Sequence, residues 1–413
     1  MANTLVTPSL IAKEALIQLE NNLVMGNRVH REYKKEFTGG QGDTVSIRKP
    51  VKFYTADGAT RVNQDVEEKT TSITIDQRKH VSWKFSTEDL TLSIEQYSER
   101  YIKPAMITLA NTVDRSLHGL YTTGWNSVGT PGTTPANFAA VAAAAQRMDE
   151  MAVPSDMRSM VMNPAAHYAI AGNQLTLDSV GAMGKSAYER AQVGYVAGFD
   201  TFSTQNVQSH TVGVATGTPL VNGANQDVTY AASTGANSQT LVTDGWTNST
   251  TGILKAGDVF TIAGVYAVNP VPGEGTTGKT VLPYLQQFTV LADADSGAST
   301  GPATLTISPA IITSGPFQTV SAAPADNAAI TVLGTGGTAY PQNLGFHKNA
   351  LALVTVPLQM PDGAAFKARE SDNGLSVRVI KDYDIDTDED IIRLDILYGC
   401  RAIYPDLMTR LWG

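Results

Sequence analysis

The segment IEQYSERYIKPAMITLANTVDRSLHGLY, residues Ile94–Tyr121, carries the longest helical pattern in the chain. Its apolar residues recur at steps of three and four, as on one face of an α-helix; they are Ile102, Met106, Leu109, Val113, Leu117 and Leu120. Ser93 and Gln96 resemble a capping box, and Pro104 predicts a kink or a break near Lys103. At 1.5 Å per residue this helix would be about 40 Å long, which is typical of a structural part rather than of an active site.

Residues 38–86, directly before this helix, have the pattern of a long two-stranded ribbon. Residues Ala56–Glu68 form a polar tip, and Thr70–Phe85 return as a strand with a change of phase around Asp76–His80 that predicts a bulge or twist. At about 3.3 Å per residue the return strand would reach roughly 50 Å. Because a two-stranded ribbon is not stable alone in water, we expect it to lie on a neighbouring copy of the chain rather than on its own subunit.

Composition and charge limit the classes of function. The chain has 413 residues, which is enough for two or three domains. Apolar residues make up 42% of it, and its formal net charge is −9. An acidic chain is not expected to bind nucleic acid over its whole surface, although it can still enclose it. Cys400 is the single cysteine, so the sequence contains no disulfide framework and fits a reducing compartment. No secretory signal and no apolar run long enough to span a membrane is present.

Further along the chain, the composition changes sharply at Thr211. Residues 134–205 alternate helices and short strands, as in a mixed α/β domain. Residues 211–337 have few charges and are rich in Thr, Gly, Ala and Ser, and the α/β pattern resumes after them. Short strand patterns recur between turn residues in this region, at Gln239–Thr243, Asp258–Val268, Gln287–Leu291, Ala303–Ser308 and Ala329–Leu333. They predict an inserted small β-barrel or sandwich.

No motif in the chain predicts catalysis. Residues Gly273–Thr280 match the phosphate-loop pattern letter for letter, but Pro283 and a strand follow where the loop requires a helix. The acidic run from Asp382 to Asp390 lacks the Gly and Glu positions of a calcium loop, so we interpret it as a turn between two strands. The six histidines show no metal-ligand spacing. We therefore predict no metal site, no cofactor and no enzyme activity.

Several stretches resemble a known family, the major capsid (coat) proteins of tailed bacteriophages with the Hong Kong 97-like fold. In order along the chain they are RSMVMNP (158–164), VAGFD (196–200), NLGFHKNALAL (343–353) and IRLDILYG (392–399). The stretch KAGDVFTIAGV (255–265) resembles the insertion domain of the coat proteins of short-tailed phages of the Salmonella type. The resemblance implies an α+β capsid fold with an inserted small all-β barrel.

The resemblance also implies a division of the chain into segments. In order they are an N-arm (1–37), an E-loop (38–86), a spine helix with part of a peripheral domain (87–149), a first part of an axial domain (150–210), the inserted β-barrel (211–337), a second axial part (338–373) and the C-terminal strands of the peripheral domain (374–413).

The function implied by the resemblance is structural. The chain would self-assemble, through hexamers and pentamers, into the icosahedral shell that loosely contains a double-stranded DNA genome, and it would be located in the virion after assembly in the cytoplasm of the bacterial host. Further implied partners are a separate scaffolding protein, a portal protein and, in some phages, a decoration protein, with no membrane partner. The separate scaffold is expected because the arm begins at the start of the sequence.

Charged residues of the ribbon and of the arm are the candidate contacts between subunits. They are Arg61, Asp65, Glu67 and Glu68 at the ribbon tip, and Arg28 and Arg31 in the arm. Complementary charges on a partner would set the register of the contact; the alternative is that all six are solvated surface charges. Two other functions stay open at this point, namely another phage structural protein of the tail or decoration type, and a nucleotide hydrolase that uses Gly273–Thr280.

Overall fold

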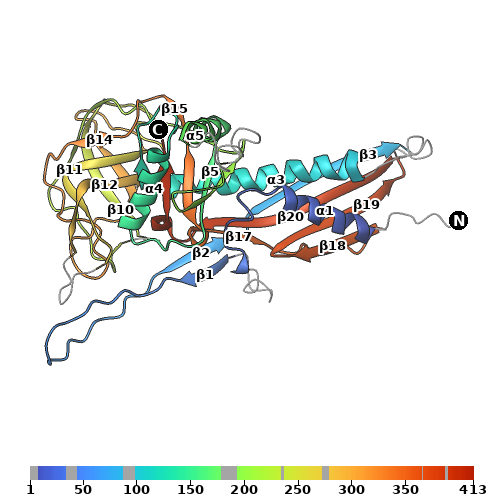
Figure 1. The fold of residues 1–413 in the computed structure, drawn as a ribbon, viewed down its shortest axis with the longest axis horizontal. Coiled ribbons are helices and arrows are strands. Elements are labelled where there is room, and N and C mark those ends of the chain that lie inside the picture. Colours follow the sequence, from blue (N-terminus) through green and yellow to red (C-terminus); the bar gives the residue numbers. More distant parts are fainter. Residues whose placement is uncertain are drawn as a thin grey trace. The chain divides into compact units, whose positions relative to one another are not determined.

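A computed structural model describes residues 8–33, 44–86, 98–177, 193–233, 237–271, 279–364, 366–386 and 389–413 (Figure 1). The chain forms two compact units. Unit 1 comprises Met1–Ser46, Ser72–His118 and Leu351–Arg401, and unit 2 comprises Ile47–Thr71, Gly119–Ala350 and Ala402–Gly413. The fold class is mixed α+β, as predicted. No helix among the described residues has the length and apolar character needed to cross a membrane.

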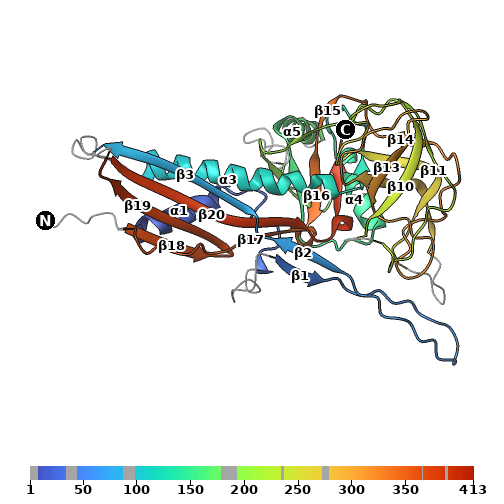
Figure 2. The same cartoon turned by 180° about the vertical axis from the view of Figure 1, so that it is seen from behind.

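Unit 1 is a five-stranded sheet with two helices on it. Its strands are β3 (Gln77–Ser86), β17 (Leu351–Thr355), β18 (Phe366–Asp372), β19 (Leu375–Asp384) and β20 (Glu389–Ala402). The order is β17-β20-β19-β18, and β3 pairs with β20 along its whole length. Strands β18, β19, β20 and β3 pair antiparallel. Helices α1 (Pro8–Asn22) and α3 (Lys103–His118) lie along this sheet and pack against each other (Figures 1 and 2).

Helix α3 confirms the central prediction. Five residues of its predicted apolar stripe are buried, namely Ile102, Met106, Leu109, Val113 and Leu117. A π-helical turn, η2 (Ser98–Ile102), changes to α-helix at Lys103, and a 3-10 turn, η3 (Gly119–Thr123), follows. The break therefore occurs where Pro104, which lacks a backbone N–H, predicts it. The expected capping box at Ser93 and Gln96 lies outside the described residues.

Helix α1 is an integral part of unit 1, which the prediction of an arm did not include. Its Leu16 and Leu19 side chains are buried. After the helix, the backbone N–H groups of Val24 and Gly26 donate hydrogen bonds of 2.7 and 2.9 Å to the carboxylate of Asp114 on α3. Burial raises the pKa of Asp114, although these N–H groups oppose the shift. One buried carboxylate thus fastens the chain after α1 to α3.

The expected single return strand over Thr70–Phe85 is wrong. Strand β2 (Thr70–Thr74) pairs with β1 (Thr44–Arg48), but the strand breaks before Gln77, and β3 joins β20 instead. The break falls at the edge of the region where the change of phase predicts a bulge. Residues 77–86 leave the ribbon because β20 offers them ten consecutive backbone partners, from Tyr398 to Glu389.

The ribbon is therefore shorter than predicted, and its outer part is not a regular ladder. Residues 49–69 contain no strand, and the backbone pair from Lys49 N–H to Lys69 C=O, at 2.7 Å, continues the pairing of β1 with β2 by one step. Beyond it the side-chain amide of Gln64 bonds to both the N–H and the C=O of Tyr54, at 3.0 and 2.6 Å. A side chain here takes the place of a backbone partner.

Unit 2 contains a six-stranded mixed sheet flanked by helices. The strand order is β4 (Ser127–Val128), β21 (Met408–Leu411), β16 (Asn343–His347), β5 (Arg158–Met162), β7 (Phe199–Ser203) and β6 (Tyr195–Val196). Helices α4 (Phe138–Glu150) and α5 (Pro164–Leu177) pack against it (Figure 1). The side chain of Asn137 caps α4 by accepting a 2.9 Å hydrogen bond from the N–H of Ala140.

Strand pairing divides the C-terminal third differently from the predicted segments. Residues 338–373 were expected together, but Leu351–Thr355 belongs to unit 1, where β17 pairs with β20. Residues 374–413 were also expected together, but β21 lies between β4 and β16 in unit 2. A short 3-10 turn, η5 (Pro405–Leu407), leads directly into that strand.

The inserted region is a small, nearly closed β-barrel. Its strands are β9 (Gly217–Val221), β10 (Gln239–Trp246), β11 (Val259–Val268), β12 (Val281–Val290), β13 (Ala303–Ser308) and β14 (Ile330–Val332), in the order β14-β11-β12-β13-β10-β9. A bridge between Leu220 and Ala329 brings the two edges together. The chain enters through β8 (Ser209–Thr211) and leaves through β15 (Ala339–Pro341), which pair antiparallel. Each predicted strand of this region overlaps a strand of the structure, but β12 begins six residues before the predicted start at Gln287, and β9 was not predicted.

Candidate functional site

The phosphate-loop look-alike is not followed by the helix that a phosphate loop requires. Residues 272–278 lie outside the described part of the chain, but Thr280 leads directly into strand β12 at Val281. The N–H of Asn269 donates a 2.9 Å hydrogen bond to the C=O of Thr280, which is the pairing of an antiparallel hairpin between β11 and β12. A phosphate loop needs a helix N-terminus after the loop, and a strand stands there instead.

The other chemical candidates also have structural explanations. The acidic run belongs to the β19–β20 hairpin, with Asp382 and Asp384 at the end of β19 and Glu389 and Asp390 at the start of β20. Among the described residues no group of three His, Cys, Asp or Glu side chains is placed to hold a metal ion. Burial raises the pKa of the Cys400 thiol to about 11, so that this thiol is protonated and unreactive near neutral pH.

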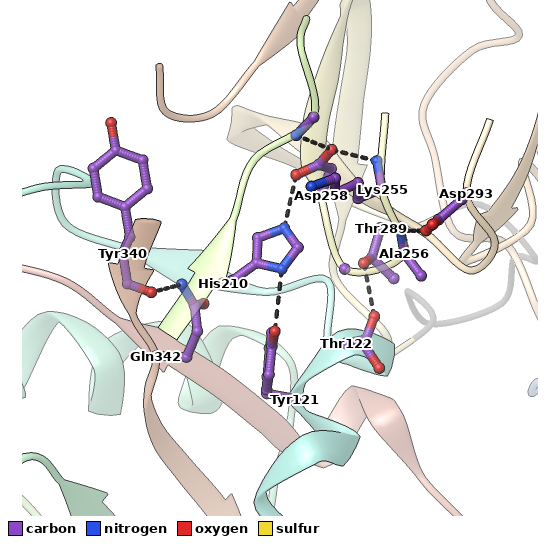
Figure 3. A network of polar contacts seen from close by, with 12 residues as sticks. Tyr121, Thr122, His210, Lys255, Ala256, Asp258, Thr289, Asp293, Tyr340 and Gln342 are labelled. Carbon is purple, nitrogen blue, oxygen red and sulfur yellow. Dashed lines mark hydrogen bonds and ion pairs between the residues drawn. The ribbon is translucent and has the colours of Figure 1, made fainter. Parts of the chain in front are cut away.

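A buried network centred on His210 is the most elaborate polar feature of unit 2 (Figure 3). His210 on β8 places its Nε2 atom 2.7 Å from Oδ1 of Asp258 and its Nδ1 atom 3.1 Å from the hydroxyl of Tyr121. The second carboxylate oxygen of Asp258 accepts hydrogen bonds from the N–H groups of Gly213, at 3.0 Å, and Lys255, at 2.7 Å. Asp258 is 1% exposed, so each of these bonds replaces one that water would otherwise make.

Arg410 on β21 adds a buried positive charge beside this network. It donates hydrogen bonds to the C=O of Gly257, at 2.6 Å, and to Oγ1 of Thr289, at 3.3 Å, and its guanidinium lies 5.3 Å from the centre of the Tyr121 ring. Burial lowers the pKa of Arg410 to about 10, while Tyr121 and Asp258 oppose the shift. Arg410 therefore remains charged near neutral pH.

Close approach at Gly257 makes this arrangement possible. Its φ angle is +103°, and a Cβ atom there would lie 3.1 Å from Cε1 of His210 and 3.0 Å from the methyl group of Thr122. Thr289 on β12 donates a further 2.9 Å hydrogen bond to the C=O of Thr122. The network thus joins η3, β8, β21 and the loop before β11 to the barrel strand β12. Its chemistry is that of a structural junction, which holds the barrel on the rest of unit 2.

Sequence reasoning missed this junction. Its members come from residues 121, 210, 258 and 410, so that no local spacing connects them. The one local signal is Asp258, a carboxylate directly before an apolar strand pattern. A charge at such a position needs buried partners, but the sequence does not say where in the chain they are.

The base of the ribbon contacts its own unit, contrary to the expectation that the ribbon has no place there. The ammonium group of Lys69 donates hydrogen bonds to the C=O and the hydroxyl of Ser233 and lies 4.7 Å from the centre of the Tyr230 ring. Lys52 and Lys49 lie over the rings of Phe317 and Tyr404, at 5.9 and 5.6 Å. Only the part beyond Lys52 keeps the character predicted for it, because Phe53, Val62 and Val66 are 58%, 50% and 62% exposed.

The predicted contact residues fall into two groups. Arg61, Asp65, Glu67 and Glu68 are all exposed on the ribbon, and Glu68 forms a surface ion pair of 3.4 Å with Arg48. Arg28 is exposed after α1, whereas Arg31 is half-buried. Burial lowers the pKa of Arg31, opposed by Glu20, and its guanidinium donates a 3.3 Å hydrogen bond to Asn27. Their contact with another copy stays a prediction.

The chain is similar to several known phage proteins. The family model described as P22 coat protein matches residues 1–412. The chain is 23% identical to a major capsid protein of Acyrthosiphon pisum secondary endosymbiont phage 1, over the full length of both proteins. Among solved structures, one of Mycobacterium phage Che8 matches 94% of this chain and 90% of its own, with 13% identity and a TM-score of 0.48. The capsid structure of Cyanophage P-SCSP1u covers 90% and 84%, with 12% identity and a TM-score of 0.42.

The family match extends along almost the whole chain and includes the inserted barrel. It therefore does not depend on one domain or on one short motif. The chain belongs to the P22 coat protein family.

Proposed function

We propose that this chain is the repeating subunit of an icosahedral shell around a double-stranded DNA genome and that its ribbon makes the main contact between subunits. Membership of a coat protein family makes the chain a capsid protein. The outer ribbon supports this proposal most strongly. Its residues 49–69 form no strand, and its side chains Phe53, Val62 and Val66 are 58%, 50% and 62% exposed. Such a segment is stabilised when a second surface covers it.

The energetics favour many reversible contacts. Covering apolar side chains contributes about 25 cal/mol for each Å² removed from water, but ordering the ribbon and fixing the orientation of a partner offset much of that gain. A single contact is then weak enough to be corrected during assembly. Repeated around a closed shell, with each subunit held on several sides, the same contacts produce a stable container.

This proposal includes the structural segments and the partner proteins that the family resemblance implies. The ribbon would act as the E-loop, α3 as the spine helix, and the six-stranded sheet of unit 2 as the centre of the axial domain. A separate scaffolding protein and a portal protein would act during assembly in the host cytoplasm, and DNA would be contained without extensive binding because the chain is acidic, with a net charge of −9. No catalytic step is part of this function.

A double substitution in the outer ribbon tests the proposal. Changing Phe53 and Val66 to Asp is expected to abolish closed shells, because it places charges in the surface that a neighbour would cover. The thermal midpoint of the unassembled subunit should change by no more than about 2 °C, because both side chains are exposed. Shell yield is measured by sedimentation and electron microscopy.

Val242→Asp is the matched control, because Val242 is exposed on barrel strand β10, away from the ribbon. It should leave the shell yield close to that of the unaltered chain. Shells that form equally well from the ribbon variant and from the control would refute the role of the ribbon.

A further inference from the structure

Unit 2 contains a pocket of about 400 Å³ whose wall combines lysines with aromatic rings. The ribbon base contributes Lys49 and Lys52, and the barrel contributes Lys279 and Phe317. Asp406 is the one acidic side chain among the residues that line it. The wall is therefore positive, in a chain whose net charge is −9.

Lys279 is the unusual member of this wall. It is only 8% exposed, and the described residues offer its three N–H donors one hydrogen bond, of 2.9 Å, to the C=O of Gln318. Burial, followed by repulsion from Lys52, lowers the pKa of Lys279 to about 7. Within the described part of the chain no carboxylate lies within 4.0 Å of the amines of Lys52 or Lys279. An anionic group in the pocket would offset the repulsion between Lys52 and Lys279 and would accept the hydrogen bonds that Lys279 does not make to the described residues.

The rest of the wall suits an apolar group. Trp125 and Phe317 line it, and Phe317 stacks on Tyr230 with the ring centres 3.6 Å apart. Val271 at the rim is 57% exposed. A ligand that fits would carry carboxylates on either side of an apolar side chain.

Residues Tyr383–Asp386, where strand β19 ends and the turn toward β20 begins, have this composition. Ile385 is 82% exposed, and aspartates flank it on both sides. Asp384 accepts a 3.0 Å hydrogen bond from the N–H of Asp386. This bond restrains the backbone on both sides of Ile385, which lowers the conformational entropy that these three residues would lose on binding.

We propose that the pocket receives this turn from a second copy of the chain, with Ile385 among the aromatic rings and Asp384 and Asp386 facing Lys52 and Lys279. The inference rests on the proposed function, because a shell supplies neighbouring copies at high local concentration. A turn on one copy and a pocket on the next form a heterologous contact, and such contacts close into rings when the rotation between copies permits.

Cysteine cross-linking between copies tests the contact. Two chains are prepared in a Cys400→Ser background, one with Ile385→Cys and the other with Val271→Cys. Assembled together and treated with a short bis-maleimide, they should give a covalent dimer in shells and none in dilute unassembled protein. Val281→Cys, on an exposed position of β12 outside the pocket, replaces Val271→Cys in the control and should give no dimer.

A charge exchange provides a second measurement. Asp386→Lys should slow assembly at least tenfold, and the same change at Asp372, an exposed residue at the end of β18, should have little effect. Adding Lys52→Asp to Asp386→Lys should restore most of the rate.

The outcomes separate this inference from the proposed function. Shells without the cross-link and without charge rescue overturn the docking of the turn and leave the shell function intact. A third chain carries both cysteines and detects contact within one copy. If the cross-link forms only within that chain, the turn fills the pocket of its own copy, which also overturns the inference. Failure of the unaltered chain to form any assembly refutes both.

Discussion

Replacing Asp258 with alanine is expected to lower the free energy of unfolding by about 3–5 kcal/mol. The substitution leaves His210 without its 2.7 Å partner and leaves the N–H groups of Gly213 and Lys255 buried without an acceptor. It also removes the negative charge next to the buried Arg410. Urea titration followed by circular dichroism measures the change, with the slope of the transition checked for constancy.

Asp293→Ala is the matched control for this variant. Asp293 is exposed, and its Oδ1 atom accepts one hydrogen bond of 2.8 Å from the N–H of Ala256 in the same loop region (Figure 3). Water can replace that bond, so the loss should stay below about 1 kcal/mol. Similar losses for the two variants would mean that the His210 network does not hold the barrel in place.

Replacing Asp395 with alanine should have a comparably large effect in unit 1. This carboxylate is fully buried and accepts hydrogen bonds of 2.5 and 3.2 Å from Arg378 and of 2.8 Å from Arg393. Arg378 is itself 8% exposed, so its charge would remain buried without a counter-ion. The expected loss is about 3–5 kcal/mol by thermal or urea denaturation.

Asp390→Ala, on the same strand, provides the comparison for Asp395. Its 3.2 Å ion pair with Lys381 is partly exposed, which limits the expected loss to about 1 kcal/mol. Burial tends to raise the pKa of Asp395, but hydrogen bonds from Arg378 and Arg393 outweigh it, and the pKa is lowered. The stabilisation is therefore complete above about pH 4 and is lost as the pH falls through the folded-state pKa. A penalty for Asp395→Ala that disappears already at pH 6 would contradict this account.

Local patterns were sufficient for much of the fold. The stripe from Ile102 to Leu117 predicts a buried helical face because its spacing depends only on the geometry of the helix. Most of the barrel strands could be predicted for the same reason, because the alternation of apolar and polar residues and the turn residues between strands are local signals. Pro104 placed the change of helix type correctly because its effect acts on neighbouring residues.

The pairing of strands that are far apart in the sequence could not be predicted from such local patterns. Residues 77–86 have the composition of a ribbon strand, and only the presence of β20, about three hundred residues later, draws them into unit 1. Strand β21 likewise depends on β4 and β16. The His210 network and the lysine pocket each combine side chains from distant segments, so that neither leaves a motif in the sequence. Partner choice between strands is decided by tertiary packing rather than by local propensity.

Electron microscopy of the protein, expressed together with its scaffolding protein, shows directly whether the chain assembles. We expect closed shells of uniform size, or hexameric and pentameric capsomers, from the unaltered chain. A preparation that contains only folded single chains at high concentration, with no capsomer or shell in the images, would contradict this expectation.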